Sequence, residues 1–142
     1  MARDLIHHEV RDALIADGWV ITHDPFELFY GDDELAPDLG AERLLGAENG
    51  IEQIIVEIKS LRARSFIQAV GQAIGQYILY RTVLNEIESP RRLWLAISEE
   101  AASQISDHPA AELLMTKELI NLVVIAIDAR KVVAWQPAHS ST

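Results

Sequence analysis

The chain contains no cysteine, which excludes disulfide bonds, thiolate metal sites and a cysteine nucleophile. It also lacks an apolar run of the ~18 residues that a membrane-spanning helix needs, so we expect no membrane association. Its first residues carry no apolar segment of the secretory type, which favours a cytoplasmic protein. The length of 142 residues predicts a single domain over residues 1–136, followed by a polar C-terminal tail at 137–142.

Basic residues are scarce in the first part of the chain. Residues 1–57 hold three basic and 14 acidic residues, whereas residues 58–142 hold nine basic and eight acidic ones. The formal net charge of −10 argues against a protein that coats nucleic acid over a broad surface. An acidic half of this kind can hold a cation through clustered carboxylates, or it can serve solubility alone.

One apolar run, residues 54–59, carries two charges in the sequence Ile-Ile-Val-Glu-Ile-Lys. It predicts a buried strand, and the period of two places Glu57 and Lys59 on the same face. Burying charges costs free energy unless they are paired or hold a metal. The two residues therefore form either a plain ion pair or part of a functional site.

A hairpin is predicted directly before this strand, because Asn49-Gly50 separates two apolar runs. A two-residue turn would place Glu42 opposite Glu57, with Asp38 further out on the same face. A bulge would shift this register, so either Asp38 or Glu42 is expected to lie nearest Glu57.

Helices and strands are predicted along the rest of the chain from apolar periodicity and from turn-forming residues. Helices are expected at 4–17, 66–86, 99–107 and 109–115, and strands at 19–22, 26–30, 40–48, 51–59, 92–97, 119–128 and 132–135. This order predicts the α/β (α+β) class, with a central mixed sheet that contains a β-hairpin and is flanked by helices.

The helix at 66–86 carries a polar stripe of Gln72, Gln76 and Tyr80, which lie four residues apart and so one above another. This stripe either contributes to a site or simply forms hydrogen bonds to the sheet. Gly71 and Gly75 lie inside the same helix, and we expect close packing against the sheet to explain them.

A cluster of His7, His8 and Glu9 lies in the first predicted helix. Adjacent helical residues point about 100° apart, so the two histidines do not easily share one metal ion. We therefore expect them to lie on a solvated surface, while Glu9 remains able to face the sheet.

Pro37-Asp38 followed by Glu57-Ile58-Lys59 resembles the PD-(D/E)xK signature of restriction-endonuclease-like nucleases. Phosphodiester hydrolysis uses a divalent metal held by hard oxygen ligands, and a lysine beside it to stabilise charge. Gln76 and Tyr80 resemble the Q-xxx-Y motif that a subset of these nucleases carries on the following helix.

Further stretches resemble the XisH family: residues 17–19 (Asp-Gly-Trp), 21–25 (Ile-Thr-His-Asp-Pro), 38–42, 56–60, 75–81 and the closing strand near Trp135. The resemblance implies a restriction-endonuclease-like fold and a controlling factor for excision of a DNA element during heterocyst differentiation in cyanobacteria. It also implies a small partner protein, XisI.

The resemblance further implies a site that hydrolyses DNA with Mg²⁺ or Mn²⁺ as cofactor. The catalytic candidates are Asp38, Glu57, Lys59 and Gln76. Asp38 and Glu57 are the expected metal ligands, with Glu42 and Glu9 as additional candidates, and the candidates for contact with DNA are Arg62, Arg64, Tyr80 and Arg81. The alternative is a catalytically silent regulatory subunit that acts through a XisI-like protein or a recombinase, and a homodimer remains open.

Overall fold

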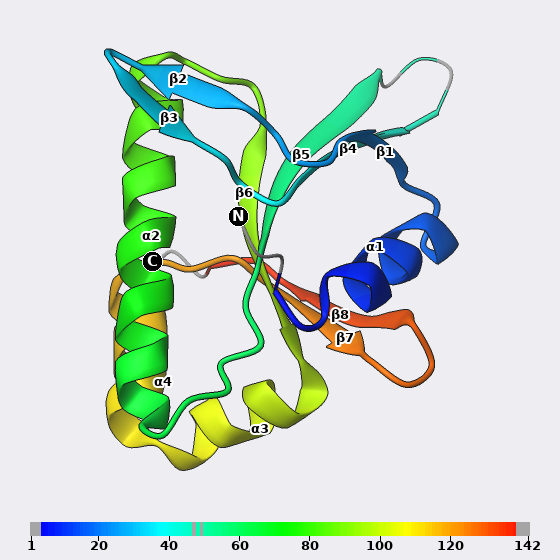
Figure 1. The fold of residues 1–142 in the computed structure, drawn as a ribbon. Coiled ribbons are helices and arrows are strands. Elements are labelled where there is room, and N and C mark those ends of the chain that lie inside the picture. The colour runs from blue at the N-terminus through cyan, green and yellow to red at the C-terminus, as the bar shows by residue number, and fades with distance from the viewer. Residues whose placement is uncertain (1–3, 47, 49, 139–142) are drawn as a thin grey trace.

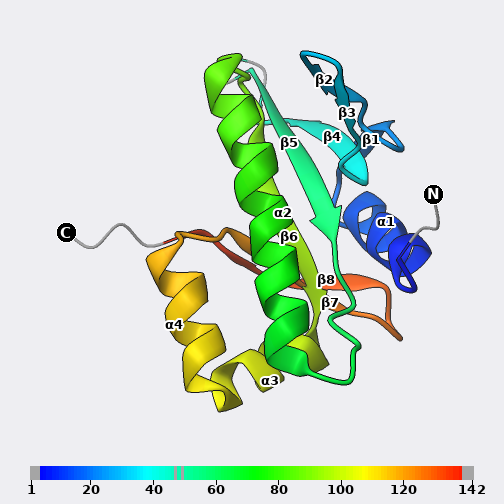
Figure 2. The same cartoon turned by 60° about the vertical axis from the view of Figure 1, so that its left-hand side comes forward.

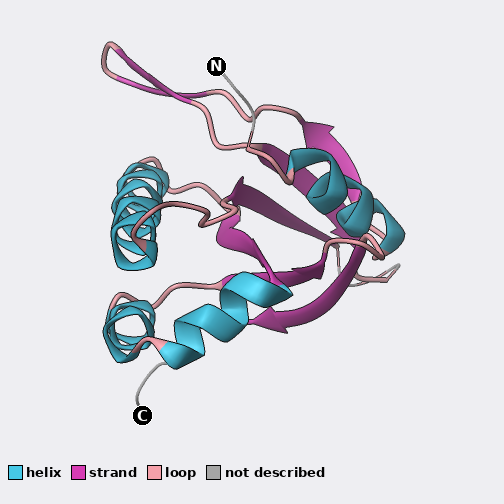
Figure 3. Cartoon of the chain, turned by 60° about the horizontal axis from the view of Figure 1, so that its bottom comes forward, coloured by secondary structure: helices cyan, strands magenta, loops and turns pink. Residues whose placement is uncertain are grey.

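The computed structural model describes residues 4–46, 48 and 50–138, and it places a six-stranded sheet between two layers of helices (Figures 1 and 3). The helices are α1 (His7–Ala16), α2 (Phe66–Glu86), α3 (Glu99–Asp107) and α4 (Pro109–Lys117). The sheet follows the order β1 (Val20–His23), β4 (Leu39–Leu44), β5 (Ile51–Ile58), β6 (Arg92–Ser98), β7 (Leu122–Ala126) and β8 (Lys131–Gln136). A separate hairpin consists of β2 (Leu28–Tyr30) and β3 (Asp33–Leu35).

The predicted fold class, a mixed sheet flanked by helices, is confirmed. Strands β5, β6 and β7 are parallel neighbours, whereas β4 pairs antiparallel with β5, β1 antiparallel with β4, and β8 antiparallel with β7. Helix α1 covers one face of the sheet and α2 lies along the other, as Figure 2 shows. Because side chains alternate along β5, Ile54 and Val56 pack with α1, while Ile55 packs with α2.

Helix α2 begins and ends where the sequence predicts. The Ser65 hydroxyl accepts a hydrogen bond of 3.4 Å from the Gln68 N–H, which caps the first turn. The prediction of close packing at Gly71 and Gly75 was wrong, because both are exposed and a Cβ at either position would meet no atom within 4 Å.

Alanine at these two glycines is therefore expected to stabilise the protein. Each of Gly71→Ala and Gly75→Ala should raise the free energy of unfolding by about 0.5–1 kcal/mol, since alanine restricts the unfolded chain and clashes with nothing. Urea denaturation measures this change. Gly18→Ala serves as the contrast, because Gly18 has a φ of +98° and alanine there should destabilise the fold. A loss of stability in the α2 variants would contradict the expectation.

Helix α1 starts at His7, three residues later than predicted. Asp4 lies outside the helix, where its carboxylate accepts hydrogen bonds from the Ile6 and Ser60 N–H groups. The predicted apolar stripe is confirmed, since its members are all buried: Ile6, Val10, Ala13 and Leu14. Within the described part of the chain, no helix is long and apolar enough to cross a bilayer.

The predicted hairpin between β4 and β5 exists, but its register was wrong. Leu44 faces Ile51, so the strands are joined by residues 45–50 and not by a two-residue turn; Asn49 of that turn lies outside the described residues. Glu42 consequently faces Gln53 and not Glu57. In the observed register Leu39 faces Val56 and Ala41 faces Ile54, and these four side chains are fully buried.

Candidate functional site

A cavity of about 530 Å³ opens where the N-terminal end of α1, the end of β5 and the middle of α2 converge. Five ionisable side chains that the sequence singled out line it: His7, Asp38, Glu57, Lys59 and Tyr80. The residues that line it are Asp4, His7, Asp24, Pro25, Glu34, Ala36, Asp38, Glu57, Ile58, Lys59, Gln76 and Tyr80.

Asp38 and Glu57 are held beside each other at the point where strand β4 begins. The Asp38 N–H donates to Glu57 Oε1 over 3.3 Å, and the Ile58 N–H donates to Asp38 Oδ2 over 2.8 Å. These two hydrogen bonds extend the β4–β5 ladder beyond Leu39 and Val56, its last pair. Of the two predicted alternatives, Asp38 and not Glu42 is therefore the neighbour of Glu57.

Glu57 is a buried carboxyl group in an acidic environment, with 3 % of its surface exposed. Burial, followed by the negative charge of Asp38, raises the pKa of Glu57 from 4.5 to about 8. Lys59 Nζ lies 3.4 Å from Glu57 Oε2 and opposes this rise. One ammonium group thus faces two carboxyl groups, so the ionised site carries an excess of negative charge.

Helix α2 contributes the polar pair that the sequence predicts. Gln76 Nε2 donates to the Tyr80 hydroxyl over 2.8 Å, and both residues line the cavity. Burial, then the charges of Glu57 and Asp38, raise the pKa of Tyr80, so the phenol keeps its proton at neutral pH.

His7 also belongs to the cavity, so its predicted position on a solvated surface was wrong, whereas His8 is exposed as expected. His7 Nε2 lies 2.9 Å from Asp24 Oδ1, and Arg11 pairs with the other oxygen of Asp24. The sequence held a signal for this position. His7 stands three and seven residues before Val10 and Leu14, on the same buried helical stripe.

The remaining predicted residues do not line the cavity. Glu42 acts electrostatically on Arg91, and Glu9 lies 3.9 Å from Arg130. Arg81 donates to the carbonyl oxygen of Glu118 near α4. The two other predicted DNA contacts are exposed between β5 and α2: Arg62 and Arg64.

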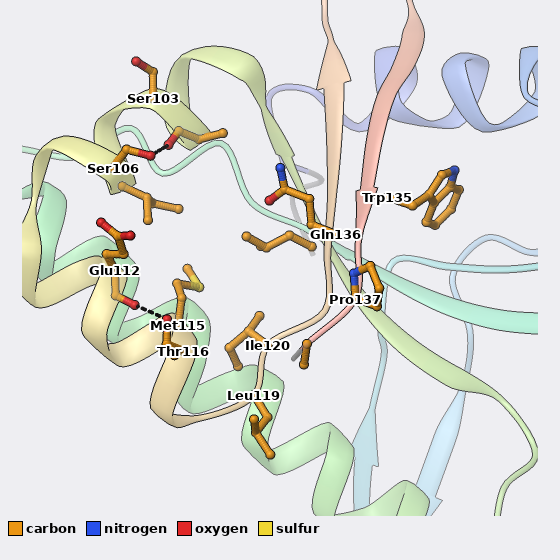
Figure 4. Close-up of a pocket in the computed structure, with 14 residues that line it drawn as sticks. Ser103, Ser106, Glu112, Met115, Thr116, Leu119, Ile120, Trp135, Gln136 and Pro137 are labelled. Carbon is orange, nitrogen blue, oxygen red and sulfur yellow. Dashed lines mark hydrogen bonds between the residues drawn. The ribbon is translucent and has the colours of Figure 1, made fainter. Parts of the chain in front are cut away.

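A larger cavity, of about 710 Å³, lies between α3, α4 and the end of β8 (Figure 4). Its hydroxyl groups on Ser106 and Thr116 donate to carbonyl oxygens within their own helices, those of Ala102 and Glu112. Of the described residues that line it, Glu112 alone is ionisable. Within the described part of the chain the larger cavity therefore holds no pair of charged side chains, and the smaller cavity is the candidate site.

Fold and site together define an α/β protein in which two carboxyl groups and a lysine meet at the end of a central strand. The chain belongs to the XisH family, whose model, described as XisH protein, matches residues 1–133. Comparison with curated protein sequences gives no match.

Two solved structures share this fold. An XisH family protein from Nostoc punctiforme PCC 73102 is 28% identical, with a TM-score of 0.83. A FdxN element excision controlling factor protein from Anabaena variabilis is 30% identical, also with a TM-score of 0.83. In both comparisons the match covers 94% of this chain and 99% of the other chain.

Proposed function

We propose that this chain is a nuclease with a restriction-endonuclease-like fold, which hydrolyses DNA phosphodiesters with a divalent metal during control of DNA element excision. The observation that carries the proposal is the convergence of Asp38, Glu57 and Lys59 at the end of β5. The excision role is drawn from the Anabaena variabilis relative and from the family resemblance.

The side chains at the site suit a divalent cation. Asp38 and Glu57 supply hard oxygen donors, which Mg²⁺ and Mn²⁺ bind readily. Burial and the negative charge of Asp38 together raise the pKa of Glu57, and Lys59 alone does not offset them. A bound cation would polarise the scissile phosphate and increase the acidity of a water molecule.

The chain's own residues complete the proposed chemistry. The water oxygen would form a bond to phosphorus while the bond from phosphorus to the leaving oxygen breaks, and the proton that the water loses would pass through solvent to the leaving oxygen. Lys59, whose side chain is 30% exposed, points its ammonium group toward the cavity and donates to the attacking water and to a phosphate oxygen. Gln76 and Tyr80 form the polar wall on the α2 side and orient the phosphate.

Cleavage of supercoiled and branched DNA by purified protein in Mg²⁺ or Mn²⁺ tests the proposal. Lys59→Ala is expected to cut about 100-fold or more slowly, because removal of one donor to the developing charge costs roughly that factor. Lys131→Ala is the matched control, since Lys131 is an exposed lysine on β8, and it should cut like wild type. If wild type cuts no faster than Lys59→Ala, the nuclease assignment fails.

One observation favours a second candidate function, a regulatory subunit that acts through a XisI-like protein or a recombinase. Four carboxylates are exposed on the β2–β3 hairpin and the residue before it, and they would repel DNA phosphates: Glu27, Asp32, Asp33 and Glu34. Glu34 also lines the cavity. On this alternative, wild type cuts no DNA with or without the XisI-like partner but still binds that partner in a pull-down.

A further inference from the structure

His7 holds a buried nitrogen atom whose hydrogen-bonding capacity is unused. Its side chain is 2% exposed, and Nδ1 has no hydrogen-bond partner among the described residues. Nδ1 lies 3.7 Å from Asp38 Oδ1, which is too long for a hydrogen bond. Burial of a polar atom without a partner costs free energy, so its retention at a cavity needs an explanation.

The surroundings of His7 favour one arrangement of its ring proton. A carboxylate is an acceptor only, so the His7 Nε2–H donates to Asp24 Oδ1 over 2.9 Å. Arg11 pairs with the second oxygen of Asp24 and fixes that carboxylate in place. In the neutral ring, Nδ1 then presents a lone pair to the cavity, where Asp38 Oδ1 presents another.

Two lone pairs that face each other repel, unless a cation lies between them. Two ligand atoms on one divalent metal ion stand about 3.0–3.5 Å apart when each bond is near 2.1 Å. The distance of 3.7 Å between His7 Nδ1 and Asp38 Oδ1 requires only a small closure to reach that range. When one ring nitrogen of a histidine binds a metal ion, the N–H of the other ring nitrogen commonly donates to a carboxylate, which fixes the orientation of the ring. Asp24 is that carboxylate for His7.

We propose that His7 Nδ1 is a third protein ligand, beside Asp38 and Glu57, of the cation at this site. This proposal rests on the proposed metal-dependent function. An imidazole ligand disfavours Mg²⁺, which takes oxygen donors, and favours transition ions such as Mn²⁺. The site is therefore selective for a transition ion over Mg²⁺, and His7 is the source of the selectivity.

Electron spin echo spectroscopy of the Mn²⁺-loaded full-length protein tests the assignment directly. Wild type and His8→Gln, the control at the exposed neighbouring histidine, should show coupling from a directly bound nitrogen, and His7→Gln should lose it. The ratio of Mn²⁺ to Mg²⁺ affinity, from calorimetric titration, should fall about 10–100-fold in His7→Gln alone.

Wild-type protein labelled with ¹⁵N-histidine decides the question even if His7→Gln does not fold, since among the described residues His7 is the one histidine that lines the cavity. Replacement of the ¹⁴N coupling by a ¹⁵N coupling supports the proposal. If Mn²⁺ binds wild type, is lost in Asp38→Ala and shows no nitrogen coupling, then His7 is not a ligand. The proposed metal site at Asp38 and Glu57 still stands in that case. Absence of Mn²⁺ binding to wild type overturns both.

Discussion

Glu57→Gln is expected to make the metal-free protein more stable than wild type above about pH 8, while the two proteins have similar stability near pH 5. Burial and Asp38 raise the pKa of Glu57 in the folded protein to about 8, whereas in the unfolded chain the group has its ordinary value of 4.5. The folded state therefore retains a proton that the unfolded state has released, and the free energy of unfolding of wild type falls as the pH rises between these values.

The size of the effect follows from the difference between the two pKa values. Each pKa unit corresponds to about 1.4 kcal/mol, so wild type loses on the order of 3–5 kcal/mol between pH 5 and pH 9 through this one group. Glutamine has nearly the same shape but no charge, so Glu57→Gln avoids that loss. Urea denaturation in EDTA at pH 5, 7 and 9 measures the difference.

Glu86→Gln provides the control, because Glu86 is an exposed carboxylate on α2 and its replacement should leave the pH dependence of wild type unchanged. Parallel loss of stability in wild type and Glu57→Gln from pH 5 to pH 9 would show that Glu57 ionises normally in the fold. Addition of Mn²⁺ to wild type at pH 9 should recover much of the lost stability, since a cation stabilises the ionised carboxylates.

Tyr77→Ala is expected to lower the free energy of unfolding by about 3–5 kcal/mol, and Tyr77→Phe by about 1–2 kcal/mol. Tyr77 lies on α2 with 1% of its surface exposed. Its hydroxyl donates to the Leu93 carbonyl over 3.0 Å and accepts from the Asn121 N–H over 3.2 Å. One side chain thus joins the helix to the segments that carry β6 and β7.

The two variants separate the packing of the ring from the hydrogen bonds of its hydroxyl. Phenylalanine keeps the ring and leaves the Asn121 N–H without this acceptor, whereas alanine also leaves a cavity. Leu79→Ala is the control on the same helix, because Leu79 is 48% exposed and should cost much less. Equal losses in Tyr77→Phe and Tyr77→Ala would show that the ring itself contributes nothing.

The parts of the fold that sequence predicts well are those in which local signals agree. Ser65 is a capping residue before 21 residues with helical apolar spacing, and α2 has the predicted bounds. The charged strand that ends in Glu57 and Lys59 was likewise predicted, because charges are rare in an apolar run of this kind. The limit shows at α4 and β2, each of which differs by two residues at one end from its predicted bounds, and at β3, which was not predicted.

The parts that sequence reasoning missed depend on contacts between distant residues. The register of β4 and β5 pairs Leu39 with Val56 and Ala41 with Ile54, and it does not follow from a two-residue turn at Asn49-Gly50. The buried His7 pairs with Asp24, which lies 17 residues away. Asp24 stands before Pro25, and nothing near it in the sequence indicates a histidine partner.

Every residue that lines the candidate cavity falls between Asp4 and Tyr80. The chain after α2 supplies the strands and helices that support this region, and its turn between β7 and β8 exposes Asp128 and Ala129. A fluorophore or affinity handle attached at that turn would follow the protein without altering the groups that face the cavity. A truncated chain that ends after α2 would retain every lining residue and lose three of the six strands that hold them in place.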